Sequence, residues 1–417
     1  MSDNYDLVVI GGGSGGLAAA QRAVEYGATA AVIERGRLGG TCVNVGCVPK
    51  KVMWSAETLA HAFHDARDYG FAVPPHIPHD WAALKARRDA YVERLNGIYA
   101  RNLDTKKIPH IAGVARLKDA HTVQVGDREL VGSHLLIATG GRPSIPAIPG
   151  AELGIDSDGF FELESLPRRV AIAGAGYIAV EFAGMLRALG ADVTLFFRYD
   201  SVLRTFDAML QESLLEALAD DGITLVPRTT PAALEGNPGD VRVRTEAGAM
   251  HGPFDCWIWA AGRVPETEAL GLDAAGVEVD ERGYVPTDAY QVTNVGHIYA
   301  VGDVSGRVQL TPVAIAAGRR LADRVFGGMA GRHLSYDNIP SVIFTHPPIG
   351  TCGITEAQAR EKHGDAVKTY TSDFVPLFYG VTDHKPRTRM KLVTVGPDEQ
   401  VVGLHVIGPG ADEMLQG

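Results

Sequence analysis

The same order of local patterns occurs twice in the chain, at positions about 160 residues apart. Each copy has an apolar strand-like run, a glycine-rich turn, a helical period and a second strand-like run. The first copy comprises 7–10, the turn with Gly11, Gly13 and Gly16, 17–26 and 30–33. The second copy comprises 170–173, the turn with Gly174, Gly176 and Ala179, 177–189 and 193–197. Because this order is typical of βαβ nucleotide-binding units, the duplication predicts an α/β chain with two parallel-sheet domains.

The residue that follows the second strand differs between the copies. In the first copy it is Glu34, whose carboxylate can accept hydrogen bonds from an adenosine ribose while the glycines let the backbone approach a pyrophosphate. In the second copy Arg198 stands in that place, and Arg204 follows six residues later. Two guanidinium groups suit a ribose 2′-phosphate, so we expect NADP(H) rather than NAD there. The alternatives are a glycine turn without nucleotide and arginines that are simply solvated.

Composition excludes several classes of function. The 417 residues are 46% hydrophobic and 21% charged, as in a globular chain of roughly two to four domains. The formal net charge of −11 argues against non-specific binding to nucleic acid or to an anionic membrane surface. The chain lacks a run of 18 apolar residues and a signal-like start, and its four cysteines are too few for a disulfide scaffold. We therefore expect no membrane association and a cytoplasmic location.

Two of the four cysteines lie close together in the stretch GGTCVNVGCVPKK, at Cys42 and Cys47. A zinc site is disfavoured because no second Cys or His pair stands at ligand spacing. A structural disulfide is disfavoured because it would close a very short loop. A redox-active dithiol beside a nucleotide-binding unit is the interpretation that remains. Lys50 follows Cys47 by one helical turn and can bring positive charge to a flavin or to a thiolate.

Further motifs run through the whole chain: GGTCVNVGCVPKKVMW, GAGYIAVEFAG, IYAVGDVSG, LTPVAIAAGRR, HPPIGT and DEMLQG. With them the chain resembles the flavin-dependent pyridine nucleotide–disulfide oxidoreductases, and among these the members that reduce glutathione. The resemblance implies a homodimer with FAD and NADPH as cofactors, and two Rossmann-like domains followed by an α+β dimerisation domain. The implied boundaries are 1–145 for FAD binding, 146–264 for NADPH binding, 265–335 for a central domain and 336–417 for the interface.

The resemblance also implies roles for individual residues. Cys47 would face the flavin, and Cys42 would attack the substrate. Tyr177 would gate the nicotinamide pocket, and Glu181 would pair with Lys50. The residues implied to bind FAD are Gly11, Gly13, Ser14, Gly15, Gly16, Glu34, Thr41, Cys42, Lys50, Ala115, Gly140, Asp303 and Thr311. Those implied to bind NADPH are Gly174, Ala175, Gly176, Ile178, Glu181, Arg198, Arg204, Gly262 and Val342.

The implied reaction passes electrons from NADPH through FAD and the Cys42–Cys47 disulfide to oxidised glutathione, which leaves as two thiols. The residues implied to contact this substrate are Ser14, Tyr99, Asn102 and Arg319. Ala18 stands where enzymes for the cationic substrate trypanothione carry an acidic residue. Gln21 departs from the pattern, since some glutathione-reducing members have Arg there, and this weakens one proposed contact. Another small disulfide remains the alternative substrate.

The resemblance also leads to an expectation about the end of the chain. In the family, further residues follow DEMLQG and hold a His-Pro motif with a catalytic Glu. His346-Pro347 lacks that Glu, because Thr351 stands five residues on, so we expect His346 to be structural. A truncated interface domain is expected, with disulfide reduction retained but poor dimerisation and slow glutathione release. The alternative class is a flavin-binding redox sensor, or a remnant limited to the reductive half-reaction.

Overall fold

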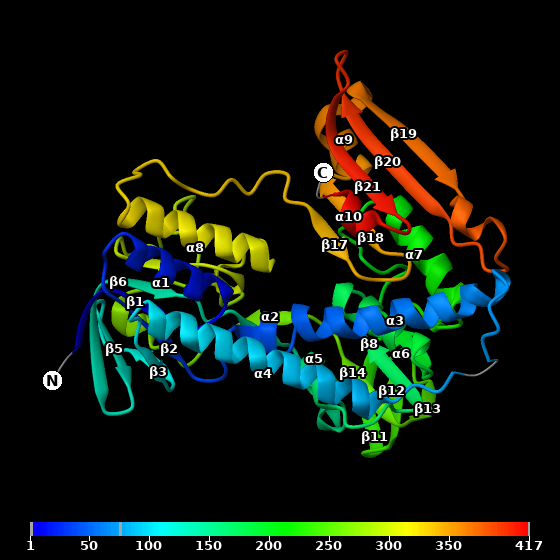
Figure 1. Cartoon of the computed structure of the whole chain (residues 1–417), viewed down its shortest axis with the longest axis horizontal. Coiled ribbons are helices and arrows are strands. Elements are labelled where there is room, and N and C mark those ends of the chain that lie inside the picture. The colour runs from blue at the N-terminus through cyan, green and yellow to red at the C-terminus, as the bar shows by residue number, and fades with distance from the viewer. Residues whose placement is uncertain (1–2, 75–76, 416–417) are drawn as a thin grey trace. The chain divides into compact units, whose positions relative to one another are not determined.

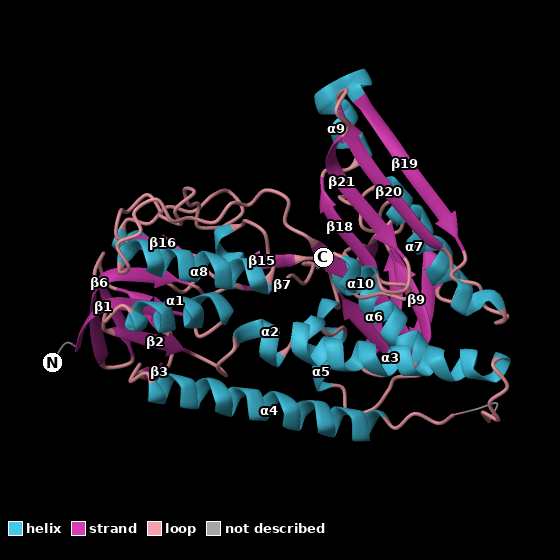
Figure 2. Ribbon diagram, turned by 45° about the horizontal axis from the view of Figure 1, so that its top comes forward, coloured by secondary structure: helices cyan, strands magenta, loops and turns pink. Residues whose placement is uncertain are grey.

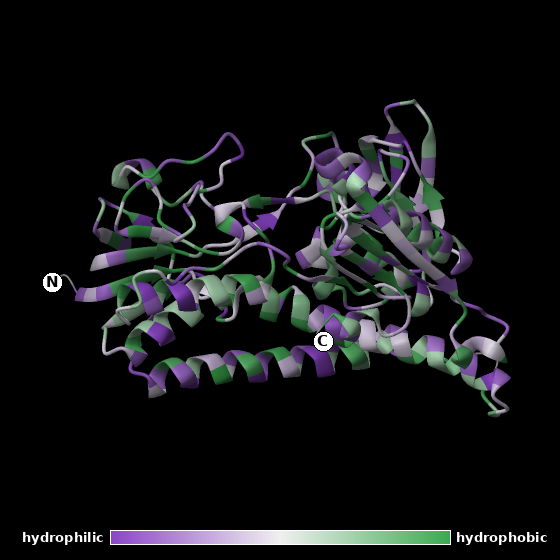
Figure 3. Ribbon diagram, turned by 90° about the horizontal axis from the view of Figure 1, so that it is seen from above, coloured by the Kyte–Doolittle hydropathy of each residue, from purple (hydrophilic) through white to green (hydrophobic). Residues whose placement is uncertain are grey.

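The computed structural model describes residues 3–74 and 77–415. The chain divides into two compact units. The first comprises 1–50, 86–142 and 263–336, and the second comprises 51–85, 143–262 and 337–417. Helices α3 (Cys47–Asp68) and α4 (Trp81–Thr105) each contribute residues to both units. Helix α4 alternates hydrophobic and hydrophilic residues along its length (Figure 3). Within the described residues, none of the helices combines the length and apolar character needed to cross a bilayer.

The first unit is built on a sheet with strand order β3–β2–β1–β6–β5–β4, in which β16 also pairs with β6. Its strands are β1 (Asp3–Ile10), β2 (Ala30–Glu34), β3 (His110–Ala112), β4 (Ala115–Leu117), β5 (Thr122–Val125), β6 (Arg128–Ile137) and β16 (Ile298–Ala300). Strands β3, β2, β1, β6 and β16 pair in parallel, whereas β4, β5 and β6 pair antiparallel. The short strands β7 (Gly141–Pro143) and β15 (Arg263–Pro265) pair with each other.

The burial of both faces of β1 accounts for the first apolar run of the sequence. Val8 and Ile10 belong to one hydrophobic core cluster, and Leu7 and Val9 belong to another. Side chains alternate between the two faces of a strand, so both faces of β1 are covered. All four side chains are buried, which is why the run is continuous rather than alternating.

Helices α1 (Ser14–Glu25) and α8 (Thr311–Val325) lie side by side (Figure 1) and share the core cluster that contains Leu7 and Val9. Their backbones approach closely at Gly15 and Gly318. A Cβ atom on Gly318 would lie 2.5 Å from the Gly15 carbonyl oxygen, so only glycine permits this distance. The contact lets the two helices pack at backbone distance.

The second copy of the sequence repeat forms β8 (Arg169–Ala173), α6 (Tyr177–Ala188) and β9 (Asp192–Phe196) in the second unit. These strands belong to a parallel sheet of order β10–β9–β8–β14, completed by β10 (Thr224–Val226) and β14 (Cys256–Trp259). An antiparallel sheet packs against it through shared apolar residues. Its strands are β11 (Pro231–Asn237), β12 (Asp240–Thr245) and β13 (Met250–Phe254). The short helix α5 (Ser157–Glu162) belongs to the same unit. Both predicted βαβ units are thus present, which confirms the α/β class.

The β-rich segment from 336 onward forms an antiparallel sheet of order β17–β18–β21–β20–β19 (Figure 2). Its strands are β17 (Ser341–Ile343), β18 (Ile349–Gly353), β19 (Val367–Phe374), β20 (Thr388–Val395) and β21 (Gln400–Ile407). The accompanying helices are α7 (Ala208–Asp220), α9 (Glu356–His363) and α10 (Ala411–Met414). This α+β arrangement agrees with the predicted change of fold type. The predicted domain boundaries themselves remain a prediction.

A buried ion pair ties this sheet to α7. The Lys391 ammonium donates to the Asp207 carboxylate at 2.7 Å and to Glu356 at 2.9 Å. Asp207 is almost completely buried and also caps α7 by accepting the Met209 N–H. The lysine therefore neutralises a carboxylate that cannot reach solvent.

We expect Lys391→Met to lower the free energy of unfolding by about 3 kcal/mol, because it leaves Asp207 charged and buried without a cation. The matched control is Lys368→Met, which removes an exposed, solvent-screened pair with Glu399 and should lower the free energy of unfolding far less. Denaturant unfolding of the two variants measures the difference. If both variants lost the same free energy of unfolding, the buried pair would stabilise the protein no more than the exposed pair.

Candidate active site

The first glycine turn permits a close backbone approach that other residues could not make. Gly11 has φ +111°, and a Cβ atom there would lie 2.3 Å from the Ala138 carbonyl oxygen. A Cβ atom on Gly16 would lie 2.2 Å from the Gly11 oxygen. Gly13 precedes α1, and among the described residues no side chain caps this helix. The first N–H groups of α1 are therefore available to an anion, which is the usual arrangement for a dinucleotide pyrophosphate.

Glu34 lies at the end of β2 and faces this turn. Its carboxylate accepts one hydrogen bond from the Gly12 N–H and one from the Gly36 N–H, both at 2.7 Å. A carboxylate has about four acceptor positions, so the two that remain can accept ribose hydroxyl groups. The residues present therefore fit the adenosine end of FAD.

The dithiol segment packs against the same turn. Helix α2 (Gly40–Asn44) carries Thr41 and Cys42, and α3 begins at Cys47. Gly40 has φ +60°, and a Cβ atom there would lie 2.8 Å from the Gly13 Cα. Glycine at both positions lets the two backbones touch, which holds the thiols beside the proposed pyrophosphate site.

Thr311 joins the thiols from a distant part of the sequence. As the first residue of α8, it places its hydroxyl oxygen 3.6 Å from the Cys47 sulfur. Cys47 is exposed and Cys42 is half-buried, and both are free thiols. The site thus combines two sulfurs and a hydroxyl group at the start of two helices.

The two thiols share their protons unequally. The Cys42 thiol hydrogen-bonds to Cys47 and, with the Thr311 hydroxyl and the Lys50 charge, lowers the pKa of Cys47 to about 6. The same hydrogen bond, together with burial, raises the pKa of Cys42. In the reduced pair the negative charge therefore resides on Cys47, and the proton resides on Cys42.

The remaining residues predicted in the first unit lie on several elements. Tyr99 is half-buried on α4, close enough to Cys42 for that thiol to raise its pKa, after the larger effect of burial. Asn102 on α4 and Arg319 on α8 are exposed. Ala115 is buried on β4, Gly140 has φ +70°, and burial raises the pKa of Asp303.

Sequence reasoning missed Asn96, which supports the dithiol segment from α4. Its side-chain amide donates to the Leu38 carbonyl at 2.8 Å and to the Asn44 side chain at 3.0 Å. Asn44 in turn donates to the Gly40 carbonyl at 2.9 Å. No local pattern marks this residue, because its partners lie far away in the sequence.

The second glycine turn repeats the geometry of the first. Gly174 has φ +158°, and a Cβ atom there would lie 2.2 Å from the Ala260 carbonyl oxygen. Gly176 precedes α6, and a Cβ atom there would have no neighbour within 4 Å among the described residues. The Ala175 carbonyl accepts the Leu203 N–H at 2.7 Å, so the loop after β9 is tied to the turn.

Arg198 and Arg204 lie on that loop, on either side of Tyr199 in the sequence. The Arg204 guanidinium carbon is 3.5 Å from the centre of the Tyr199 ring, and that of Arg198 is 4.8 Å away. Both arginines are exposed, and neither forms an ion pair with a carboxylate among the described residues. Sequence reasoning missed Tyr199, although an aromatic residue between two arginines is a signal for such a stack. The loop thus offers two cations to an anionic ligand.

The other predicted residues of the second unit lie on α6, on β17 and in the loop after β14. Tyr177 is exposed, Ile178 is half-buried, and Glu181 is buried. The Glu181 carboxylate accepts the Phe344 N–H at 2.9 Å, two residues after Val342. Gly262 is exposed with φ +123°. Lys50 belongs to the first unit and Glu181 to the second, so their predicted pairing remains a prediction.

Comparison with known proteins agrees with this geometry. Residues 5–318 match the family model described as pyridine nucleotide-disulphide oxidoreductase, and residues 339–417 match its dimerisation domain. A glutathione reductase from Yarrowia lipolytica is 46% identical over 433 residues, which cover 99% of this chain and 92% of the relative. A glutathione reductase from Schizosaccharomyces pombe is 45% identical over 430 residues, which cover 100% of this chain and 92% of the relative.

Proposed function

Because this chain belongs to the pyridine nucleotide-disulphide oxidoreductases, we propose that it catalyses the NADPH-dependent reduction of oxidised glutathione to two thiols. This activity would support thiol redox homeostasis. The observation that carries the proposal is the Cys42–Cys47 pair, held with Thr311 against a dinucleotide-type glycine turn. The substrate assignment is supported by two relatives named glutathione reductase, each of which aligns with nearly the whole chain.

Two cofactors belong to this function. When bound, FAD supplies the transfer of two electrons from NADPH to the Cys42–Cys47 disulfide. The first glycine turn, Glu34 and the free N–H groups of α1 would hold its pyrophosphate and adenosine. Arg198 and Arg204 would hold the 2′-phosphate of NADPH, since both guanidinium groups face solvent without a carboxylate partner among the described residues. Tyr177, at the start of α6, would cover the nicotinamide end.

The position of the proton in the reduced dithiol determines the role of each thiol. Cys42 must lose its proton to attack a disulfide, and the Cys47 thiolate is the nearest acceptor. The Cys42 sulfur then bonds to one glutathione sulfur, and the other glutathione leaves as a thiolate that takes a proton. Cys47, once deprotonated, attacks the Cys42 sulfur, which re-forms the protein disulfide and releases the second glutathione. Tyr99, Asn102, Arg319 and Ser14 are proposed to position this substrate.

Assembly and location complete the proposal. The match of 339–417 to a dimerisation domain supports a homodimer. The low cysteine content and the requirement for a reduced dithiol during turnover support a cytoplasmic location.

A single assay tests the proposed function. Purified protein loaded with FAD should oxidise NADPH faster with oxidised glutathione than with lipoamide or without a disulfide. Flavin reduction by NADPH without any glutathione-dependent turnover would refute the proposal and favour a redox sensor. Faster turnover with another small disulfide would refute the substrate assignment alone.

The low pKa of Cys47 leads to a pH prediction. Because this pKa is lowered to about 6, the thiolate should predominate at neutral pH and be lost as the pH falls through about 6. The long-wavelength absorbance of the NADPH-reduced protein reports a thiolate next to the flavin and should follow this titration. Lys50→Met should move the midpoint upward, because a cation that favours the thiolate is removed.

The control for this titration is the neighbouring lysine. Lys51 lies in the second unit with its ammonium 4.1 Å from the centre of the Phe344 ring, so Lys51→Met should leave the midpoint unchanged. If the titration of the unsubstituted protein had its midpoint near the ordinary pKa of a cysteine, the proposed position of the proton on Cys42 would be wrong.

A further inference from the structure

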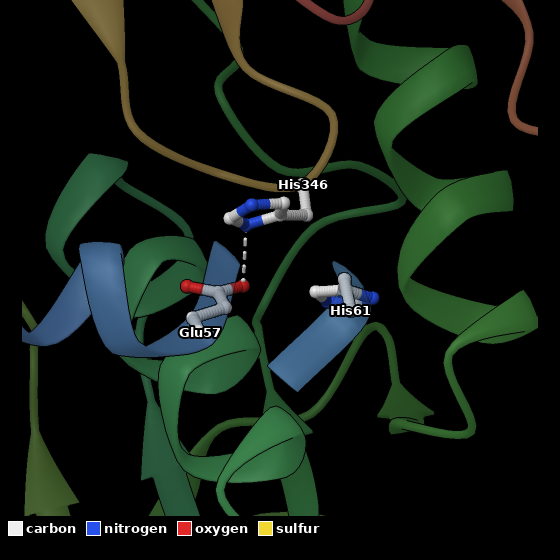
Figure 4. Close-up of side chains that lie close together, drawn as sticks. All are labelled: Glu57, His61 and His346. Atoms are coloured by element: carbon white, nitrogen blue, oxygen red, sulfur yellow. Dashed lines mark ion pairs between the residues drawn. The ribbon is translucent and has the colours of Figure 1, made fainter. Parts of the chain in front are cut away.

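Three side chains with metal-binding atoms lie together in the second unit. Glu57 and His61 are on α3, four residues apart, and therefore on the same face of the helix. His346 comes from the loop between β17 and β18. Figure 4 shows the Glu57 carboxylate pointing toward the His346 ring, with His61 beside them. One potential ligand atom from each residue lies within 4.8 Å of the others.

The Glu57 carboxylate is completely buried, and no hydrogen-bond donor reaches it from the part of the chain that the structure describes. Its Oε1 atom lies 2.9 Å from the His346 Nδ1 atom. Among the described residues, neither carboxylate oxygen nor this Nδ1 has a partner in hydrogen-bonding geometry. Gly184 on α6 leaves the space that the carboxylate fills, since a Cβ atom there would lie 2.7 Å from Oε1. A buried carboxylate without donors is costly, so a ligand that supplies positive charge would stabilise it.

The hydrogen bonds around His346 determine which nitrogen faces Glu57. The Thr58 hydroxyl donates its hydrogen to the Trp54 carbonyl at 3.0 Å. The same hydroxyl oxygen lies 3.1 Å from the His346 Nε2 atom, so it accepts the hydrogen that Nε2 carries. The neutral ring therefore has a lone pair on Nδ1, directed at the carboxylate. Two acceptors that face each other at 2.9 Å repel unless a proton or a cation lies between them.

The ring of His346 is also fixed by its neighbours. It stacks on His61 with the ring centres 4.7 Å apart, and its centre lies 5.3 Å from the centre of the Trp54 ring. Neutral imidazole is the form that binds metal ions.

We propose that Glu57, His61 and His346 bind a divalent transition-metal ion of the zinc type. Two imidazoles and one carboxylate are a ligand set that zinc uses in proteins, and it leaves a fourth position for water. A tetrahedral ion with bonds of about 2.1 Å separates its ligand atoms by about 3.4 Å, and the candidate ligand atoms here lie within 4.8 Å of one another. The Thr58 hydroxyl, by accepting from Nε2, orients His346 as outer-shell partners of metal-bound histidines do. The ion would fasten α3 to the loop between β17 and β18.

The test is a titration of the FAD-loaded protein with zinc chloride, followed by calorimetry and by metal analysis after dialysis. Because a reduced dithiol also binds zinc, the titration is made in a Cys42→Ser/Cys47→Ser background. We expect one zinc ion per chain and a higher melting temperature with zinc. Glu57→Gln and His61→Gln should each weaken binding by at least about 100-fold, and Thr58→Val by about 10–100-fold.

The matched control is His64→Gln, an exposed histidine on the same helix that is outside the cluster. This variant should keep the affinity and the stoichiometry. The proposal is overturned if the background protein binds no zinc, or if Glu57→Gln binds it with unchanged affinity. Because Glu57→Gln removes a buried carboxylate but preserves its shape, its own melting temperature without zinc shows that it is folded.

Discussion

Cys42→Ser is expected to lower the glutathione-dependent oxidation of NADPH by at least about 10⁴-fold, because it removes the sulfur that bonds to the substrate. Serine keeps a hydroxyl that can donate to Cys47, so the neighbouring thiolate should persist. Reduction of the bound flavin by NADPH should therefore continue at a normal rate in a single turnover. Steady-state and stopped-flow measurements on the same preparation separate the two half-reactions.

The matched control for this variant is Cys352→Ser. Cys352 is half-buried on β18, where its thiol donates to the Asn338 carbonyl at 3.1 Å, in the unit that does not hold the dithiol. This change should alter turnover by no more than about twofold. If Cys42→Ser kept full turnover with oxidised glutathione, the proposed attack by Cys42 would be wrong.

The second large effect is expected on nucleotide selectivity. Replacing both Arg198 and Arg204 by leucine should lower kcat/KM for NADPH by about 10²–10³-fold, because two charge-assisted contacts to the 2′-phosphate are lost. NADH lacks that phosphate, so its kcat/KM should be almost unchanged. The ratio of the two constants, measured with saturating oxidised glutathione, reports this difference directly.

Arg228→Leu is the control for nucleotide selectivity. Arg228 is exposed near the same loop, but its guanidinium is paired with Asp200. Its replacement should leave the preference for NADPH intact. If the Arg198/Arg204 variant lost kcat/KM equally with NADPH and NADH, the arginines would stabilise the loop and would not bind the 2′-phosphate.

Much of the fold followed from local patterns. The apolar runs and glycine turns predicted both βαβ units, because strand formation and tight turns depend on residues that are close in sequence. The structure places the second copy at Arg169–Ala173, Tyr177–Ala188 and Asp192–Phe196, close to the predicted ranges. The spacing of Cys42 and Cys47 likewise indicated a dithiol before any distance was known.

The sites depended on contacts that no local pattern contains. His346 was expected to be structural, and only the fold brings it to 2.9 Å from Glu57. Asn96 supports the dithiol segment from a separate helix, and Tyr199 lies against two arginines that sequence spacing alone could not place.

The sequence alone therefore determined the α/β class and the two nucleotide-binding units, and it predicted the reactive thiols, since each is encoded within a short stretch of chain. The tertiary structure decided which thiol carries the charge, because that depends first on the hydrogen bond between the two thiols and then on burial and Thr311. It also decided which arginines have no carboxylate partner among the described residues, and which buried carboxylate faces a histidine lone pair. Proton sharing, charge pairing and burial are set by distances between residues far apart in sequence, and only folding fixes those distances.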